Sequence, residues 1–222
     1  MAYLENLGPI SLLRDYVSKN SCRRCLIVGA GTETYLINRF TDDIIGVNIS
    51  RKELKKINLK TNLIVCDAQY IPIHRCSIGF IVCKSTLHHI KNPNACLSEM
   101  KRVLRKNGEV VLYEPGALNP IAFLGRKFFP TDIHEPSERP FNPIGLRKML
   151  IEHFQVVDEK VFFIFAHIIP ILGKKVNFLR SSRLLLSIFN LDALLCKTLL
   201  KNFCWIMVFR LRKSNKSFDD GN

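Results

Sequence analysis

The chain has 222 residues, 47% of them hydrophobic, which suits one domain with a sizeable core and excludes a disordered protein. The formal net charge of +14 and the pI of about 9.6 favour an anionic partner, such as a membrane surface or nucleic acid, but say nothing about the fold. The helical spacing of Ile10, Leu13 and Val17 predicts a first helix over 9–19 that packs on the domain.

Short apolar runs then alternate with helix-like segments along the chain. This alternation predicts an α/β domain with a mainly parallel sheet. Two helices are expected to begin after the N-caps Ser50 and Asn142, the second with Pro143 in its first turn. The expected strands are 26–28, 44–48, 62–66, 78–83, 109–113, 156–163 and 203–211. The expected helices after the first are 32–40, 50–56, 92–105 and 142–153.

Three segments depart from the alternation. Residues 115–141 form an expected long loop, rich in proline and charge, and such a loop inside a compact domain is usually functional. Residues 161–202 form an apolar and basic insertion, with a helix expected over 184–200. The polar tail 214–222 is expected to be frayed.

The eight cysteines are scattered along the chain, and the first twenty residues mix Glu5, Arg14 and Asp15 with apolar residues. The sequence therefore predicts no signal peptide, reduced thiols and a cytoplasmic location. Cys22 and Cys25 form a C-x-x-C pair. A zinc site would need a second pair, or histidines at ligand spacing, and neither is found, so no metal site is predicted.

The apolar run 25–28 ends in Gly29-Ala30-Gly31, ahead of an expected helix. Glycine lets the backbone turn sharply and lets a ligand approach closely, and the unpaired amides of a helix start point into that gap. This predicts a ligand crevice at the carboxyl end of the first strand. Thr34 stands where the dinucleotide pattern G-x-G-x-x-G has its third glycine. A nicotinamide-dependent oxidoreductase is the alternative that rests on the two glycines alone.

Further motifs occur in a defined order. They are Cys66-Asp67-Ala68-Gln69-Tyr70-Ile71-Pro72-Ile73, Leu87-His88-His89-Ile90, Glu99, Arg102-Val103-Leu104, Gly108 and Glu114-Pro115. With these motifs the chain resembles, over 24–163, the class I S-adenosylmethionine-dependent methyltransferases. The resemblance is to the type 11 group, which includes ubiquinone and menaquinone biosynthesis methyltransferases. It implies one α/β domain over 1–213, with a Rossmann-like seven-stranded, mostly parallel sheet, an antiparallel last strand and helices on both faces.

The resemblance also implies S-adenosylmethionine as the cofactor. This ligand has no phosphates, so a glycine loop would serve close backbone contact. Asn48 ends the second strand, where the ribose hydroxyls need an acceptor, and Asp67 comes after the third, where the adenine amino group needs one. As an alternative, Asp67 is a helix N-cap. The full expected cofactor set is Gly29, Ala30, Gly31, Glu33, Asn48, Ile49, Asp67, Ala68 and Lys84.

Four positions depart from the family pattern. Ile27 and Asn48 stand where acids are usual, Glu33 where a third glycine is usual, and Gly79 where an aspartate opens the fourth strand. An amide accepts without charge assistance, so Asn48 would weaken binding by about tenfold or less. Glu33 can meet the ammonium group of the ligand, whereas Lys84 suits a sulfonium only if its amine turns away. These departures leave a non-catalytic methyltransferase-fold protein as an alternative.

The segment after the fourth strand bears on the methyl acceptor. Methyltransferases of exocyclic base amines usually carry Asn/Asp-Pro-Pro-aromatic there, and this chain reads Lys84-Ser85-Thr86-Leu87. That argues against a nucleic-acid acceptor. An RNA methyltransferase, suggested by the charge, would bring an appended RNA module, and none is visible. The candidate bases are His88, His89 and Glu114, with His134 in the long loop. A hydrogen-bonded role at a helix start is an equal alternative for either neighbouring histidine.

The insertion is the best indication of the substrate. From Lys160 to Lys213 there are ten Lys and Arg residues and one acid, Asp192, among apolar stretches too short to span a membrane. Apolar faces with a basic rim suit an anionic bilayer surface or a long apolar substrate. Alternatively, these faces cap the sheet. We therefore expect a methyltransferase of a small hydrophobic acceptor, such as a lipid, quinone or polyketide-like molecule, associated peripherally with membranes and without an obligate protein partner.

Overall fold

The computed structural model describes residues 8–20, 23–123, 140–165 and 182–213. The expectations for His134, for most of the long loop, for part of the insertion and for the tail 214–222 lie outside these residues.

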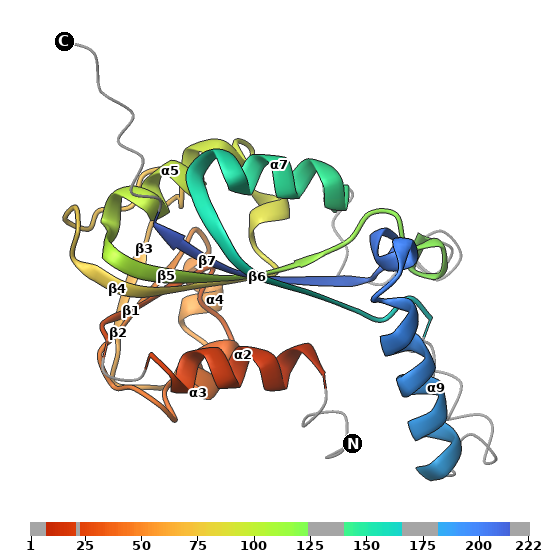
Figure 1. Ribbon diagram of the computed structural model, residues 1–222. Coiled ribbons are helices and arrows are strands. Elements are labelled where there is room, and N and C mark those ends of the chain that lie inside the picture. Colours follow the sequence, from red (N-terminus) through yellow and green to blue (C-terminus); the bar gives the residue numbers. More distant parts are fainter. Residues whose placement is uncertain (1–7, 21–22, 124–139, 166–181, 214–222) are drawn as a thin grey trace.

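Seven strands form one sheet in the order β3-β2-β1-β4-β5-β7-β6 (Figure 1). Strands β1 to β5 pair in parallel, and β7 pairs antiparallel with both β5 and β6, so the antiparallel last strand is confirmed. The strands are β1 Cys25–Val28, β2 Ile44–Asn48, β3 Asn62–Val65, β4 Ile78–Lys84, β5 Leu104–Pro115, β6 Phe154–Phe162 and β7 Ile206–Lys213. The sheet is the Rossmann-like arrangement expected from the sequence.

Helices cover both faces of this sheet (Figure 1). The short α4 is capped by Ser50, whose hydroxyl accepts from the Glu53 amide at 3.3 Å. Asn142 caps α7 in the same way through the Ile144 amide at 3.0 Å, so both expected N-caps are confirmed. The helices are α2 Pro9–Ser18, α3 Glu33–Ile37, α4 Arg51–Leu54, η1 Leu87–His89, α5 Pro93–Val103, α7 Pro143–His153, α9 Ser182–Leu195 and η4 Leu199–Phe203.

Each face of the sheet has its own apolar core. Along β5, Val110 and Leu112 pack toward the α5 side, while Val111 and Tyr113 pack toward the α2 side. This alternation results from the two-residue period of a strand. Because both faces are covered, the central strands are apolar runs rather than alternating ones.

The boundary between α5 and β5 differs from the expectation. The helix ends at Val103, not at 105, and β5 begins at Leu104 instead of 109. The cause is a pairing across the chain, in which the Ser77 amide donates to the Val103 carbonyl at 2.9 Å and Leu104 pairs with Ile78. Leu104 is apolar and fits either state, so its spacing alone could not place the boundary.

A membrane-spanning helix and a metal site can be looked for only in the described ranges. No helix within them is both long and apolar enough to cross a bilayer. They contain no group of three or more His, Cys, Asp or Glu side chains that could hold a metal ion. Seven cysteines fall within these ranges, and all are free thiols.

Candidate functional site

The glycine turn after β1 is locked against the loop after β4. Gly29 has a φ of +78°, and a Cβ added to it would lie 2.0 Å from the hydroxyl oxygen of Thr86. Only glycine fits this position, since a side chain would meet both backbone strain and a collision. The amides of Gly29 and Ala30 donate to the Val47 carbonyl at 2.8 and 2.9 Å, which ties the turn to β2.

The next amide of the turn is occupied by a side chain. Glu33 reaches back, and its carboxylate accepts from the Gly31 amide at 2.6 Å. Burial raises the pKa of Glu33, while the nearby charge of Lys84 acts against that rise. Lys84 in turn places its ammonium 5.4 Å from the centre of the Tyr113 ring. Glu33 and Lys84 both line a cavity of about 380 Å³ between α2 and α3.

Asn48 and Asp67 lie at the ends of adjacent strands, as the sequence predicts. The Asn48 amide nitrogen donates to the Ala30 carbonyl at 3.0 Å, and its oxygen accepts from the Ser50 amide at 2.8 Å. Asn48 therefore ties β2 to the glycine turn. Asp67 is not a helix N-cap here, since no helix begins between β3 and β4. Its carboxylate accepts from the backbone and side-chain nitrogens of Gln69.

The same edge of the sheet exposes apolar side chains beside these polar groups. Ile49 is 72% exposed and Tyr70 is 78% exposed, although both are large and apolar. Ala68 comes directly after Asp67 and packs partly against the core. A flat aromatic base needs apolar faces and a hydrogen-bond acceptor at its edge. Ile49, Tyr70 and Asp67 offer such groups at one edge of the sheet.

A buried carboxylate organises the loop after β4. Glu114 of β5 is fully buried, and one of its oxygens accepts from the Thr86 and Leu87 amides at 3.0 and 2.8 Å. Its other oxygen lies 2.6 Å from Nδ1 of His88. Ser85 begins this loop with a φ of +48°, which is rare for serine and occurs mostly where the surroundings impose it.

The two neighbouring histidines differ in their surroundings. His88 is buried and bonded to Glu114, whereas His89 is exposed and lies against the His88 ring, with 4.0 Å between ring centres. The Glu114 carboxylate can only accept, so Nδ1 of His88 is the donor in this contact. Among the candidate bases inside the described residues, His88 is therefore the one whose ring is fixed by a carboxylate.

Comparisons with known proteins agree with this geometry. The family model described as "Methyltransferase domain" matches residues 26–112, from β1 to β5. An uncharacterized protein from Methanocaldococcus jannaschii is 29% identical over 126 residues, which are 54% of this chain and 56% of that protein. The chain thus spans about half the length of this curated relative.

Solved structures match over nearly the whole chain. An S-adenosylmethionine-dependent methyltransferase from Archaeoglobus fulgidus has a TM-score of 0.62 at 16% identity, covering 96% of this chain and 98% of that one. Another from Mesorhizobium loti has a TM-score of 0.59 at 12% identity, covering 95% and 100%. This chain has the methyltransferase fold. The cyclase SpnF also matches, with a TM-score of 0.61 at 15% identity over 92% of this chain and 81% of that one.

The family model thus matches the part of the chain that carries the glycine turn and the loop after β4, and the solved structures share its fold. Sequence reasoning on this methyltransferase-fold chain did not single out Thr86, the residue that touches the glycine turn. It also missed Asn119, which is fully buried in the segment after β5. Neither has a sequence signal of its own, because both act through partners that are distant in the chain.

Proposed function

We propose that this protein is an S-adenosylmethionine-dependent methyltransferase acting on a small apolar acceptor, such as a lipid, quinone or polyketide-like molecule. The observation that carries the proposal is the buried pair of Glu114 and His88, at 2.6 Å, on a loop whose Thr86 contacts the glycine turn. A proton acceptor and a cofactor loop are thereby held together by one carboxylate.

When bound, S-adenosylmethionine supplies the methyl group. An acceptor hydroxyl or amine has to lose a proton, and His88 Nε2 takes it up while Glu114 stabilises the imidazolium. A positioned base of this kind contributes roughly 10² to 10⁴ in rate. Asn48, Ile49, Asp67 and Ala68 would hold the adenosine, and the turn from Gly29 to Glu33 the amino-acid part. Lys84 places its ammonium over the Tyr113 ring, 5.4 Å from the ring centre.

A second candidate function is binding without catalysis, and the contact of Glu33 with the Gly31 amide favours it. That amide is one with which a ligand carboxylate would otherwise bond, and Glu33 already bonds with it at 2.6 Å. A bound ligand has to displace this carboxylate or present its ammonium group to it.

Calorimetry with S-adenosylmethionine, its demethylated product and NAD tests the cofactor directly. We expect binding of the first two and no binding of NAD. The Gly31→Arg variant should abolish binding while the sheet stays folded, and Lys60→Arg, on an exposed lysine, is the control. If the wild-type protein binds neither of the first two ligands at millimolar concentration, the cofactor assignment is wrong.

Activity separates the two candidates. Incubation with methyl-labelled S-adenosylmethionine and a mixture of quinols, fatty acids and phenols should transfer label to one class, and His88→Ala should lower that transfer at least a hundredfold while cofactor binding is kept. Cofactor binding without transfer to any class would favour the non-catalytic alternative.

We further propose peripheral membrane association through α9 and η4. Leu194, Leu199 and Phe203 are exposed there, Leu199 by 89%, and Lys197 and Lys201 lie between them in sequence. Exposed apolar side chains next to cations suit an anionic bilayer surface. The Leu194→Ser/Leu199→Ser double variant should reduce sedimentation with phosphatidylglycerol vesicles. The control Ile151→Ser, on α7, should not reduce it. Equal sedimentation with neutral vesicles would contradict the electrostatic part.

A further inference from the structure

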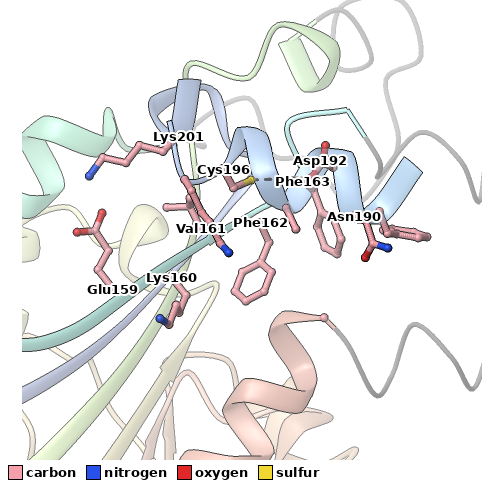
Figure 2. A pocket seen from close by; sticks show the side chains of 13 residues that line it. Glu159, Lys160, Val161, Phe162, Phe163, Asn190, Asp192, Cys196 and Lys201 are labelled. Atoms are coloured by element: carbon pink, nitrogen blue, oxygen red, sulfur yellow. Dashed lines mark hydrogen bonds between the residues drawn. The ribbon is translucent and has the colours of Figure 1, made fainter. Parts of the chain in front are cut away.

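A cavity of about 560 Å³ lies between the end of β6 and the helices α9 and η4, away from the cofactor loop. Figure 2 shows the side chains of Phe162 and Phe163 between the strand and the helix. Val161, Phe189 and Ala193 add further apolar surface to its lining. The volume suits a small organic ligand, and the aromatic lining favours an apolar ligand body.

The aromatic wall is held in a strained conformation by buried polar groups. Phe163 has a φ of +64°, which a phenylalanine rarely adopts. The Asn119 side chain donates to the carbonyls of Phe163 and Ile164 at 3.2 and 2.9 Å, and the Trp205 amide donates to the Phe163 carbonyl at 2.9 Å. On the other side, the buried carboxylate of Asp192 accepts from the Ile164 and Phe165 amides. Strain that is imposed from several directions is characteristic of ligand sites.

The charges around the cavity are unbalanced. Of its two carboxylates, Glu159 is paired with Arg147 and Asp192 is bonded to backbone amides. Lys160 lies 3.6 Å from Asp158. The two remaining cations of the lining, Lys197 and Lys201, make no ion pair with any residue of the described ranges. Among the described residues, the cavity therefore combines apolar walls with two lysines that have no ion-pair partner.

A strand residue that lines this cavity and the partner of the proposed base lie in one row of the sheet. Val161 of β6 pairs with Met207 of β7, which pairs with Glu114 of β5. Neighbouring strands are about 4.8 Å apart, so the Val161 and Glu114 backbones are separated by about 10 Å. The cavity thus lies at the same end of the strands as Glu114, the partner of His88.

We propose that the methyl acceptor is an anionic amphiphile, with a carboxylate or phosphate bound by Lys197 and Lys201 and its apolar body against Phe162, Phe163 and Phe189. This inference rests on the proposed function and adds the acceptor's charge to it. A neutral quinone would leave the two lysines without a partner.

Calorimetry with decanoate and with decanol, which share a chain and differ in charge, tests the proposal without knowledge of the natural acceptor. We expect decanoate to bind one site. Decanol should bind about tenfold more weakly, because it cannot make the two exposed charge contacts with Lys197 and Lys201. The Lys197→Gln/Lys201→Gln double variant should lower the decanoate affinity about tenfold and leave the decanol affinity unchanged. The matched control is Lys52→Gln/Lys55→Gln, on exposed lysines of the α4 segment.

A steric variant checks the location. Ala193 lines the cavity, so Ala193→Trp should abolish decanoate binding, while Leu194→Trp, at an exposed neighbour that does not line it, should not. The ligand can come from a bilayer or from solution, and sedimentation of Ala193→Trp with phosphatidylglycerol vesicles separates the two. Lost sedimentation indicates a bilayer lipid as the ligand, and retained sedimentation indicates a free anionic molecule.

Equal affinities for decanoate and decanol, or no effect of the double lysine variant, would overturn the proposal, as would the absence of decanoate binding. The cofactor is measured separately on the same proteins. Failed decanoate binding with intact S-adenosylmethionine binding rejects only the anionic acceptor. The reverse result rejects the proposed function, and with it the role of the bound anion as methyl acceptor.

Discussion

Strand β5 carries two buried glutamates, and they are stabilised in opposite ways. Glu109, near the amino end of the parallel strands, is 4% exposed and is bonded to the guanidinium groups of Arg210 and Arg212, with three contacts of 2.9 to 3.0 Å. Glu114, five residues later, is fully buried and bonded to two backbone amides and to His88. One glutamate has permanent cations beside it, and the other has a group that can gain or lose a proton.

This difference separates a structural ion cluster from the pair that we propose to be functional. Burial alone would raise the pKa of Glu109, but the hydrogen bonds from Arg210 and Arg212 outweigh it and hold that pKa below its usual value. The cluster joins β5 to β7, whose residues pair across the sheet at this point. The Glu114 side chain bonds to the loop after β4 and not to a neighbouring strand. It fixes the loop after β4 and the tautomer of His88, and both are features that a reaction needs.

The largest expected effect comes from removing the ion cluster. Glu109→Ala should lower the free energy of unfolding by about 3 kcal/mol, because Arg210 and Arg212, which are only partly exposed, both lose their carboxylate. Since the pKa of Glu109 is lowered by folding, this stabilisation is present above pH 4.5 and is lost as the pH falls below it. Urea unfolding measures the change, with Glu53→Ala at an exposed pair as control. Unchanged stability would show that the cluster is not structural.

A side chain at Gly29 would also displace the loop after β4, which Glu114 holds, because Thr86 of this loop lies against Gly29. Gly29→Ala should destabilise the protein by about 2 kcal/mol and abolish S-adenosylmethionine binding. The alanine would have to keep the positive φ of Gly29, and its Cβ would collide with Thr86. Gly145→Ala is the matched control. Its Cβ would lie 3.9 Å from Asn142 inside α7, where alanine is expected to stabilise slightly. Retained cofactor binding in Gly29→Ala would separate the turn from the cofactor site.

A milder change addresses the imidazole alone. Glu114→Gln keeps an acceptor for the Thr86 and Leu87 amides but can turn a donor toward His88, so the proton should move from Nδ1 to Nε2. The expected cost is about 1 kcal/mol in stability, with a loss of methyl transfer. Nitrogen chemical shifts of the histidine ring report the tautomer. If the shifts are the same in both proteins, Glu114 does not set the protonation of His88.

The smallest expected effect is the change in stability when Glu33 loses its charge, and this change depends on pH. Burial raises the pKa of Glu33 on folding, so its protonated form is favoured in the folded protein and stability falls as the pH rises through that pKa. Glu33→Gln keeps the acceptor for the Gly31 amide without the charge and should be more stable at pH 7 by about 0.5 kcal/mol. Below pH 4.5 the two proteins should unfold alike. A variant that is less stable at pH 7 would show that Lys84 compensates the charge fully.

The sequence predicted the sheet well because its signals are local. Apolar runs marked all seven strands, and the caps Ser50 and Asn142 marked helix starts within a residue. The start of β5 was wrong, since the pairing of Leu104 with Ile78 depends on residues that are distant in the chain.

The site was predicted as residues but not as contacts. His88 and Glu114 were both candidate bases, yet 26 residues separate them, and no spacing rule shows that they form a pair. Asn48 was expected to contact ribose, and in the structure both polar atoms of its side chain bond to the backbone. That role stays a prediction. The cavity under α9 could not be foreseen, because it depends on the conformation of Phe163 and on two buried polar side chains far apart in sequence.

The place of β7 in the sheet has a consequence for how the protein is made. β6 neighbours only β7, and β7 also completes the free edge of β5. Arg212 comes 103 residues after its partner Glu109. During synthesis, β5 and β6 leave the ribosome before β7, the strand that lies between them in the sheet. Until β7 emerges, each of them therefore has an unpaired edge. A nascent chain at this stage is open to chaperones and to aggregation, and the sheet closes only when β7 arrives.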